Sequence, residues 1–379
     1  SFDLPKIIAR KQKVVRKLVL GVKGKLTANN VTIVNGEASI VDKNHILCGD
    51  ETYECDNLLL CTGSETFIPP IPGIDTVPYW THRDALDNKE LPKSLVVIGG
   101  GVIGMEFASF FNSLGVEVTV IEMLDEILGG MDKELSAMLR AEYAKRGIKF
   151  MLDTKVVALS EVASGNGDTQ QIQVNYENAE GTGFSVAEKL LMSVGRRPVT
   201  KGFGLENLNP EKTERGNIRV DGQMRTSVPG VYACGDLTGF SLLAHTAVRE
   251  AEVAVHAVLG KKDCMSYRAI PGVVYTNPEI AGVGDTEEAL QKKGIPYRTV
   301  KLPMAYSGRF VAENEGVNGM CKLLLAEDDT VLGAHVLGNP ASEIITLAGM
   351  AVELKLTAAE WKKIVFPHPT VGEIFKEAL

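Results

Sequence analysis

Apolar positions along the chain alternate between the spacing of strands and the spacing of helices. In "LPKSLVVIGGGVIGMEFASFFNSLGVEVTVIEM", an apolar strand leads through a glycine turn into an apolar helix that ends near Gly115, and a second strand follows. Helices are also expected from about Asp132 to Arg146 and from about Leu243 to Leu259. Between these two helices, "IKFMLDTKVVALSEV", "QQIQVNYEN" and "FSVAEKLLMSVGRRP" have the pattern of strands. This order predicts an α/β protein.

The two ends of the chain have different patterns. "DLPKIIARKQKVVRKLVLGVKGKL" predicts one long helix, and "VTIVNGEASIVD" with "HILCGDETYECDNLLLCTGS" predicts a small β-meander. From Arg268 onward, a hairpin in "GMCKLLLAEDDTVLGAHVLG" and a helix in "ASEIITLAGMAVELKL" indicate mixed structure. The fold class is therefore α/β followed by a C-terminal α+β domain.

Composition narrows the class of partner. The chain has 379 residues, with 40 basic against 48 acidic side chains, and its net charge of −8 argues against nucleic acid as a partner. No apolar run approaches the ~20 residues of a membrane span, and "SFDLPKIIARKQKVV" lacks the features of a signal peptide. The six cysteines form no closely spaced metal set, and stretches such as "LLLCTG" and "VYACGD" predict buried thiols in a reducing compartment.

The glycine turn in "VVIGGGVIGMEF" has the spacing of a dinucleotide-binding motif. Gly99, Gly101 and Gly104 follow a strand and open a helix within a βαβ unit, which is the context that this motif requires. The first glycine permits the tight turn, the second lets the backbone approach a pyrophosphate, and the third lets helix and strand pack closely. A purely structural glycine turn is the alternative.

An acidic residue follows the second strand of this unit. Glu122 stands 23 positions after Gly99, where a carboxylate accepts hydrogen bonds from the adenosine ribose. Met123, Leu124 and Asp125 follow it, and no base is present to bind a 2′-phosphate. The pattern favours NAD over NADP.

A second nucleotide-type pattern occurs in "TSVPGVYACGDLTGFSLLAHTAVREAE". Asp236 ends an apolar strand, and a helix is expected to begin near Leu243. Ligands of open α/β sheets bind at this end of the strands, and a helix N-terminus favours negative charge there. An acid at this point can bind a ribityl or ribose hydroxyl. A plain strand-to-helix turn is the alternative.

Near the C-terminus, "FPHPTVGEIFKEAL" places His368 between two prolines. In one interpretation Thr370 and Glu373 form a capping box and the histidine is a spacer. In the other, His368 is a general acid–base whose ring is held by the prolines and oriented by Glu373, and it exchanges a proton with a thiol.

Several segments together resemble the pyridine nucleotide–disulfide oxidoreductase family, and within it the branch that oxidises dihydrolipoamide. They are "CTGSETFIPPIPG", "VVIGGGVIGMEF…VTVIEM", "SVGRRP", "GVYACGDLTGFSLLAH", "VVYTNPEIAGVGDTEEA" and "FPHPTVGE". The resemblance implies Rossmann-like FAD- and NAD-binding domains and a C-terminal dimerisation domain. It implies these regions: 1–78, the remainder of the FAD-binding domain; 79–198, the NAD-binding domain; 199–266, a central region with the second FAD-binding part; 267–379, the interface domain.

The resemblance also assigns site residues. For FAD it implies Ala38, Thr62, Gly63, Ser64, Asp236, Leu242, Leu243, Ala244 and His245. For NAD it implies Gly99, Gly100, Gly101, Val102, Ile103, Gly104, Met105, Glu106, Glu122, Val156 and Gly195. His368 and Glu373 would be catalytic.

One part of the family pattern is missing from these residues. The family opens with its own G-x-G-x-x-G unit for FAD and a C-x-x-x-x-C redox pair, and the sequence contains neither. Cys55 and Cys61 have five residues between them and lie in a predicted strand, so they are not taken as that pair. Two interpretations stay open: the residues belong to a longer protein, or the protein is a non-catalytic remnant.

The implied activity is oxidation of dihydrolipoamide to lipoamide, with electrons passing through a redox disulfide and FAD to NAD. It implies a cytoplasmic homodimer with shared active sites, whose partners are lipoyl domains of 2-oxo acid dehydrogenase or glycine cleavage complexes. A soluble transhydrogenase of the same family and an NAD-binding, dimerising remnant are the alternatives.

Overall fold

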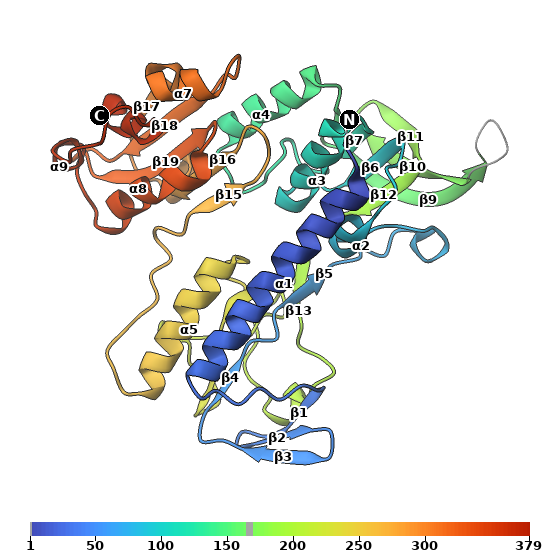
Figure 1. The fold of residues 1–379 in the computed structure, drawn as a ribbon, viewed down its shortest axis with the longest axis vertical. Helices are drawn as coiled ribbons and strands as arrows, with labels where there is room; N and C mark the ends of the chain where they lie inside the picture. The colour runs from blue at the N-terminus through green and yellow to red at the C-terminus, as the bar shows by residue number, and fades with distance from the viewer. Residues whose placement is uncertain (1, 164–169) are drawn as a thin grey trace. The chain divides into compact units, whose positions relative to one another are not determined.

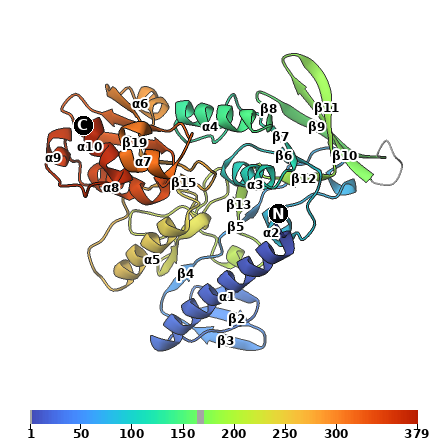
Figure 2. The same cartoon turned by 45° about the horizontal axis from the view of Figure 1, so that its top comes forward.

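The computed structural model describes residues 2–163 and 170–379, and these form two compact units (Figures 1 and 2). The first unit comprises residues 3–67 and 196–267. The second comprises residues 68–195 and 268–379. Each unit is therefore built from two stretches that are far apart in the sequence. No helix in the described part of the chain combines the length and the apolar character that a bilayer crossing needs.

The first unit begins with the predicted long helix, α1 (Leu4–Ala28). The carboxylate of Asp3 caps it by accepting a hydrogen bond from the Lys6 amide at 3.1 Å, and Pro5 stands in the first turn. The meander is shorter than predicted, because it contains only β1 (Ala38–Asp42), β2 (His45–Cys48) and β3 (Glu51–Glu54).

The strand after the meander pairs with a distant segment instead. β4 (Leu58–Leu60) runs parallel to β14 (Val231–Ala233). Short, wholly apolar strands of this kind are typical of buried parallel pairing, which the local pattern could not distinguish from a further meander strand. The remaining elements of the unit are β5 (Ser64–Thr66), β13 (Arg196–Pro198), η2 (Leu205–Asn207), η3 (Gly235–Leu237) and α5 (Ala244–Val258).

The first half of the second unit is the predicted βαβ region. A parallel sheet has the order β12-β6-β7-β8 and packs against α3, with the antiparallel sheet β11-β10-β9 beside it (Figure 2). Its elements are η1 (Ile74–Thr76), α2 (His82–Asp87), β6 (Ser94–Ile98), α3 (Val102–Ser113), β7 (Glu117–Ile121), α4 (Lys133–Lys145), β8 (Lys149–Met151), β9 (Lys155–Ala163), β10 (Gln170–Asn178), β11 (Gly181–Ala187) and β12 (Lys189–Met192).

The second half of this unit is the expected α+β region. Five antiparallel strands have the order β15-β16-β19-β18-β17, and α8 lies across β16 and β19 (Figure 1). Its elements are β15 (Gly272–Val274), β16 (Ile280–Gly284), α6 (Glu287–Lys293), β17 (Arg298–Pro303), η4 (Met304–Tyr306), α7 (Gly308–Glu313), β18 (Met320–Leu325), β19 (Val331–Leu337), α8 (Ala341–Glu353), α9 (Ala358–Lys362), η5 (Val371–Glu373) and α10 (Ile374–Ala378). The predicted hairpin is β18–β19.

The two halves of the second unit share a hydrophobic core. Val274, Ile280 and Leu337 come from the C-terminal sheet and pack in the same cluster as Phe111 and Tyr143 of α3 and α4. The Tyr143 hydroxyl also donates to the Asn277 carbonyl at 3.0 Å. Burial of these aromatic rings fixes the dinucleotide-type region onto the C-terminal sheet.

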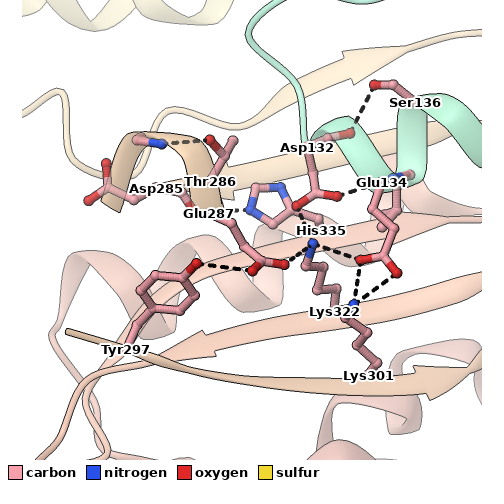
Figure 3. A network of polar contacts seen from close by, with 12 residues as sticks. Asp132, Glu134, Ser136, Asp285, Thr286, Glu287, Tyr297, Lys301, Lys322 and His335 are labelled. Carbon is pink, nitrogen blue, oxygen red and sulfur yellow. Dashed lines mark hydrogen bonds and ion pairs between the residues drawn. The ribbon is translucent and has the colours of Figure 1, made fainter. Parts of the chain in front are cut away.

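A buried ion cluster joins the same two halves (Figure 3). The Lys322 ammonium on β18 is 2% exposed, and it lies 2.8 Å from Asp132, the N-cap of α4, and 2.9 Å from Glu134. It also pairs with Glu287, the first residue of α6. Burial opposes the charge on Lys322, but hydrogen bonds to the three carboxylates outweigh it and raise the pKa of this lysine.

A histidine lies beside this cluster in the same view (Figure 3). His335 is 2% exposed, and its Nε2 lies 3.0 Å from the Asp285 carbonyl oxygen. Burial lowers the pKa of His335. The ring is therefore a neutral part of the core, so it adds no further positive charge next to Lys322.

Candidate nucleotide-binding and catalytic sites

The glycine turn of the second unit lies between β6 and α3. Gly99 has φ of +99°, and a β-carbon there would lie 2.5 Å from the Ser193 carbonyl oxygen. A β-carbon at Gly104 would lie 2.0 Å from the Gly99 carbonyl oxygen. The first and third glycines are therefore required by the turn and by close packing.

The second glycine has a different environment. Gly101 is the N-cap of α3, no side chain caps this helix, and a β-carbon at Gly101 would meet no atom within 4 Å. The described residues thus leave space over uncapped amide groups at a helix N-terminus, which is the arrangement that binds a pyrophosphate. Val102, Ile103, Met105 and Glu106 form the first turns of this helix. These residues fit a dinucleotide.

Glu122 directly follows β7, on the strand next to β6. Its carboxylate accepts hydrogen bonds from the Gly100 amide at 2.6 Å and from the Leu124 amide at 2.8 Å. The structure therefore brings Glu122 to the glycine turn. Its role in binding the adenosine ribose stays a prediction.

The other residues assigned to NAD lie on neighbouring elements. Gly195 follows β12, the strand on the other side of β6, and has φ of +121°. Val156 is in β9, two residues beyond Thr154, whose amide donates to the Glu122 carbonyl at 2.9 Å. Glu106 accepts a hydrogen bond from the Tyr275 amide at 2.9 Å, and burial raises the pKa of its carboxyl group.

The glycine turn gives the first testable prediction. Gly104→Ala is expected to lower the free energy of unfolding by at least ~1–3 kcal/mol, because the new methyl group overlaps backbone. Gly101→Ala is expected to leave stability almost unchanged but to weaken NADH binding by about tenfold or more, because the methyl group occupies the space above the helix N-terminus. Urea unfolding and NADH fluorescence titration measure the two effects.

The opposite result for the pair, a destabilised Gly101→Ala variant with unchanged NADH affinity, would contradict this assignment. Gly100→Ala provides a further comparison, because its β-carbon would lie 3.1 Å from the Ile127 side chain. This contact is intermediate between the backbone overlap at Gly104 and the open space at Gly101, so the loss of stability should be intermediate too.

The first unit holds a second polar cluster at the carboxyl ends of β4 and β14. Ser64 donates a hydrogen bond to the Asp236 carboxylate. Arg196 donates from Nε to the Ser64 hydroxyl at 2.7 Å, and its Nε lies 3.8 Å from the same carboxylate. Sequence reasoning did not assign Arg196, although it stands in the quoted "SVGRRP" segment.

The turn that presents Asp236 is held by a buried acid. Glu250 of α5 is 0% exposed, and it accepts hydrogen bonds from the Gly235 amide and the Tyr267 hydroxyl, both at 2.6 Å. Burial and the hydrogen bond to Glu250 both raise the pKa of Tyr267, so the phenol stays protonated as a donor. Glu250 was also not assigned from the sequence, because its partners Gly235 and Tyr267 are 15 and 17 positions away.

Apart from Ala38, the remaining residues assigned to FAD follow β4 or lie at the start of α5. No side chain caps α5 at Leu243, and Leu242, Ala244 and His245 are exposed there. Thr62 donates to the Val199 carbonyl at 2.8 Å, Gly63 has φ of +70°, and Ala38 begins β1. An uncapped helix N-terminus beside a carboxylate and a hydroxyl fits the ribityl and ring parts of a flavin.

Both interpretations of the C-terminal histidine describe real contacts. Thr370 and Glu373 form the capping box, with the Thr370 amide donating to Glu373 at 2.7 Å. Glu373 also lies 3.0 Å from Nδ1 of His368. The hydrogen bond from the Thr370 amide, and then the His368 ring, lower the pKa of Glu373. Because the His368 side chain is 82% exposed, its other ring nitrogen is accessible.

The prediction of buried thiols was wrong for part of the set. Cys234 and Cys321 are buried, but Cys61 and Cys264 are exposed. Cys61 is the last apolar residue of "LLLC" and stands just beyond β4, where the chain leaves the sheet. The apolar neighbours indicated the strand but not where it ends.

The fold and these sites define a dinucleotide-dependent oxidoreductase. Residues 3–251 match the family described as pyridine nucleotide-disulphide oxidoreductase, and residues 270–379 match its dimerisation domain. The chain belongs to the pyridine nucleotide-disulphide oxidoreductase family. Enzymes of this family use FAD and NAD(H), as the sequence predicted, and the dimerisation domain supports a homodimer.

Individual relatives agree with this membership. Dihydrolipoyl dehydrogenase of Geobacillus stearothermophilus is 38% identical over 100% of this chain and 80% of that enzyme. The human mitochondrial dihydrolipoyl dehydrogenase is 37% identical over 99% of this chain and 74% of its own length. Among solved structures, LpdA of Mycobacterium tuberculosis has a TM-score of 0.89 and 26% identity, covering 100% of this chain and 83% of its own. The flavoprotein disulfide reductase RclA of Escherichia coli also scores 0.89, with 27% identity, covering 100% and 86%.

Proposed function

We propose that the protein is a dihydrolipoyl dehydrogenase, which oxidises protein-bound dihydrolipoamide and passes the electrons to NAD⁺. The main observation behind this proposal is the His368–Glu373 pair. The Glu373 carboxylate contacts one ring nitrogen of His368 at 3.0 Å, while the His368 side chain is 82% exposed. The two dihydrolipoyl dehydrogenases named above, 38% and 37% identical over 100% and 99% of this chain, support the same substrate class.

In this reaction, His368 moves a proton. The ring accepts a proton from one dihydrolipoamide thiol and so leaves the thiolate that thiol–disulfide exchange needs. Glu373 accepts from Nδ1, which holds the ring in one tautomer and stabilises the imidazolium that forms. Pro367 and Pro369 restrict the backbone on both sides of the ring. When bound, FAD supplies the two-electron carrier between dithiol and NAD⁺.

Other residues of this chain bind and orient the two cofactors. Asp236, Ser64 and Arg196 form a joined hydrogen-bonding group for the ribityl chain, and Glu250 fixes the turn that carries Asp236. The Gly99–Gly104 turn and the α3 N-terminus receive the NAD pyrophosphate, and Glu122 receives the ribose. The overall reaction removes two electrons and two protons from the dithiol, and NAD⁺ gains a hydride while one proton is released.

A second candidate is an NAD-binding dimer that lacks the dithiol reaction. The observation that supports it is the uncapped N-terminus of α3 beside the glycine turn, an arrangement that binds a dinucleotide without any thiol. A soluble transhydrogenase of the same family is compatible with the same observation.

One assay of the purified protein separates these candidates. Flavin absorbance together with NADH formation from dihydrolipoamide is the expected result. A yellow protein that transfers hydride between NADPH and NAD⁺ but ignores dihydrolipoamide indicates the transhydrogenase. A colourless protein that still binds NADH indicates the non-catalytic dimer, and either of these last results overturns the proposal.

The proposal extends to partners and location. We infer that lipoyl domains of a 2-oxo acid dehydrogenase or glycine cleavage complex present the dithiol, because these carry protein-bound dihydrolipoamide. A cytoplasmic location follows from the need to keep the thiols of this reaction reduced between turnovers.

A further inference from the structure

Two cysteines far apart in the sequence meet in the first unit. The sulfur atoms of Cys61 and Cys234 are 3.3 Å apart. Leu60 on β4 is paired with Ala233 on β14, so the two cysteines are the next residues in register beyond these parallel strands. Neighbouring strands lie about 4.8 Å apart, which is within the Cα separation that a disulfide spans, about 4.4–6.8 Å.

The two thiols have different environments. Cys61 is exposed, whereas Cys234 is buried. The hydrogen bond between the sulfurs lowers the pKa of Cys61 and, together with burial, raises the pKa of Cys234. Cys61 is therefore the accessible sulfur that ionises first, and Cys234 is the protonated donor behind it. Cys61 thus has the exposure and the lowered pKa of an attacking thiol. Cys234 has the burial and the raised pKa of a resolving thiol.

We propose that Cys61 and Cys234 are a redox-active dithiol that forms a reversible intrachain disulfide when it meets a small-molecule disulfide. The Cys61 thiolate attacks one sulfur of that oxidant, whose S–S bond breaks and releases one thiolate. Cys234 then loses its proton and attacks the sulfur of Cys61 in the mixed disulfide, and the second thiolate leaves. The protein loses two electrons and two protons, and the oxidant becomes two thiols.

The cysteine pair lies close in sequence to the hydrogen-bonded residues Ser64 and Asp236. Cys234 stands two residues before Asp236, and Cys61 stands three residues before Ser64. Ser64 and Asp236 are hydrogen-bonded to each other, and Glu250 holds the amide of the intervening Gly235. Forming the bond shortens the distance between the two sulfur atoms from 3.3 Å to about 2.05 Å. The bond would join the residues that directly follow β4 and β14, on the chain segments that lead to Ser64 and Asp236. This chemistry does not use His368 and does not depend on the proposed dihydrolipoamide reaction.

The test is a thiol map of the protein equilibrated with reduced and oxidised glutathione at defined ratios. After alkylation and digestion, mass spectrometry is expected to show a peptide pair joined through Cys61 and Cys234, with the loss of two of the six free thiols. Dithiothreitol restores both thiols. Recovery of Cys61 and Cys234 in alkylated form from the most oxidising buffer overturns the proposal, as does a disulfide between either of them and another cysteine.

Variants assign the order of attack. Cys234→Ser is expected to stop at a mixed disulfide of glutathione on Cys61, whereas Cys61→Ser should leave Cys234 reduced. Cys264→Ser is the matched control, because it removes another exposed thiol and should form the disulfide as the wild type does. Circular dichroism checks that each variant is folded, and the wild-type map decides the proposal even if one variant is not. Activity is not needed as a readout, so failure here is distinguishable from failure of the dehydrogenase proposal.

Discussion

Replacing His368 by alanine is expected to lower the rate of dihydrolipoamide oxidation about 10²- to 10⁴-fold, the usual contribution of a general acid–base. NADH-to-dye transfer, which needs no proton exchange with a thiol, should stay within about twofold of the wild type. The reason is local: His368 is the exposed imidazole that Glu373 contacts through Nδ1 at 3.0 Å. Steady-state rates of the two reactions in the same preparation measure the effect.

A second histidine provides the matched control for this experiment. His45 is also partly exposed and paired with a carboxylate, Asp42, at 2.9 Å. His45→Ala removes the same kind of histidine–carboxylate contact from the meander and is expected to change neither rate. If His368→Ala reduced both reactions equally, the ring would have no specific part in the thiol step, and the proposed role would have to be abandoned.

Replacing Lys322 by methionine is expected to lower the free energy of unfolding by about 3–5 kcal/mol, the usual cost of removing one partner from a buried ion pair. Lys322, whose side chain is 2% exposed, pairs with the carboxylates of Asp132, Glu134 and Glu287. The change removes its ammonium and leaves the three carboxylates close together. Lys301 still pairs with Glu134 at 2.7 Å but lies at a more exposed position. Urea unfolding followed by tryptophan fluorescence reports on this unit, because Trp80 and Trp361 both belong to it.

Lys133→Met is the control for the loss of a lysine. Lys133 is on α4, as Glu134 is, and pairs with Asp125, but both side chains of that pair are about half exposed. Solvent already screens this pair, so its loss should hardly move the unfolding midpoint. Equal shifts for Lys322→Met and Lys133→Met would show that the buried cluster does not hold the two halves of the second unit together.

Much of the local structure follows from the order of residues. The βαβ unit from Ser94 to Ile121, the helix α1 and the β18–β19 hairpin all agree with their apolar periodicity. These elements depend mainly on neighbours within a few positions, so a short window of sequence contains their cause. The capping box at Thr370 is predictable for the same reason.

The site residues were predictable only where one short sequence motif includes the residues that come together in space. The Gly99–Gly104 turn and Glu122 belong to one such unit, and the structure brings them within hydrogen-bond distance at Gly100. Arg196 and Glu250 were missed because their partners are distant in sequence. Arg196 reaches Ser64, which is 132 positions away, and the Glu250 carboxylate of α5 meets Gly235 and Tyr267, which are 15 and 17 positions away.

The order of amino acids by itself determined most of the secondary-structure elements, the dinucleotide turn and the family to which the chain belongs. Tertiary structure alone decided that β4 leaves the meander to pair with β14, that Cys61 faces Cys234, and that Lys322 lies buried among carboxylates from α4 and α6. The physical reason is that pairing across a sheet and burial of charge depend on contacts between distant segments. Such contacts leave no periodic signal in either segment.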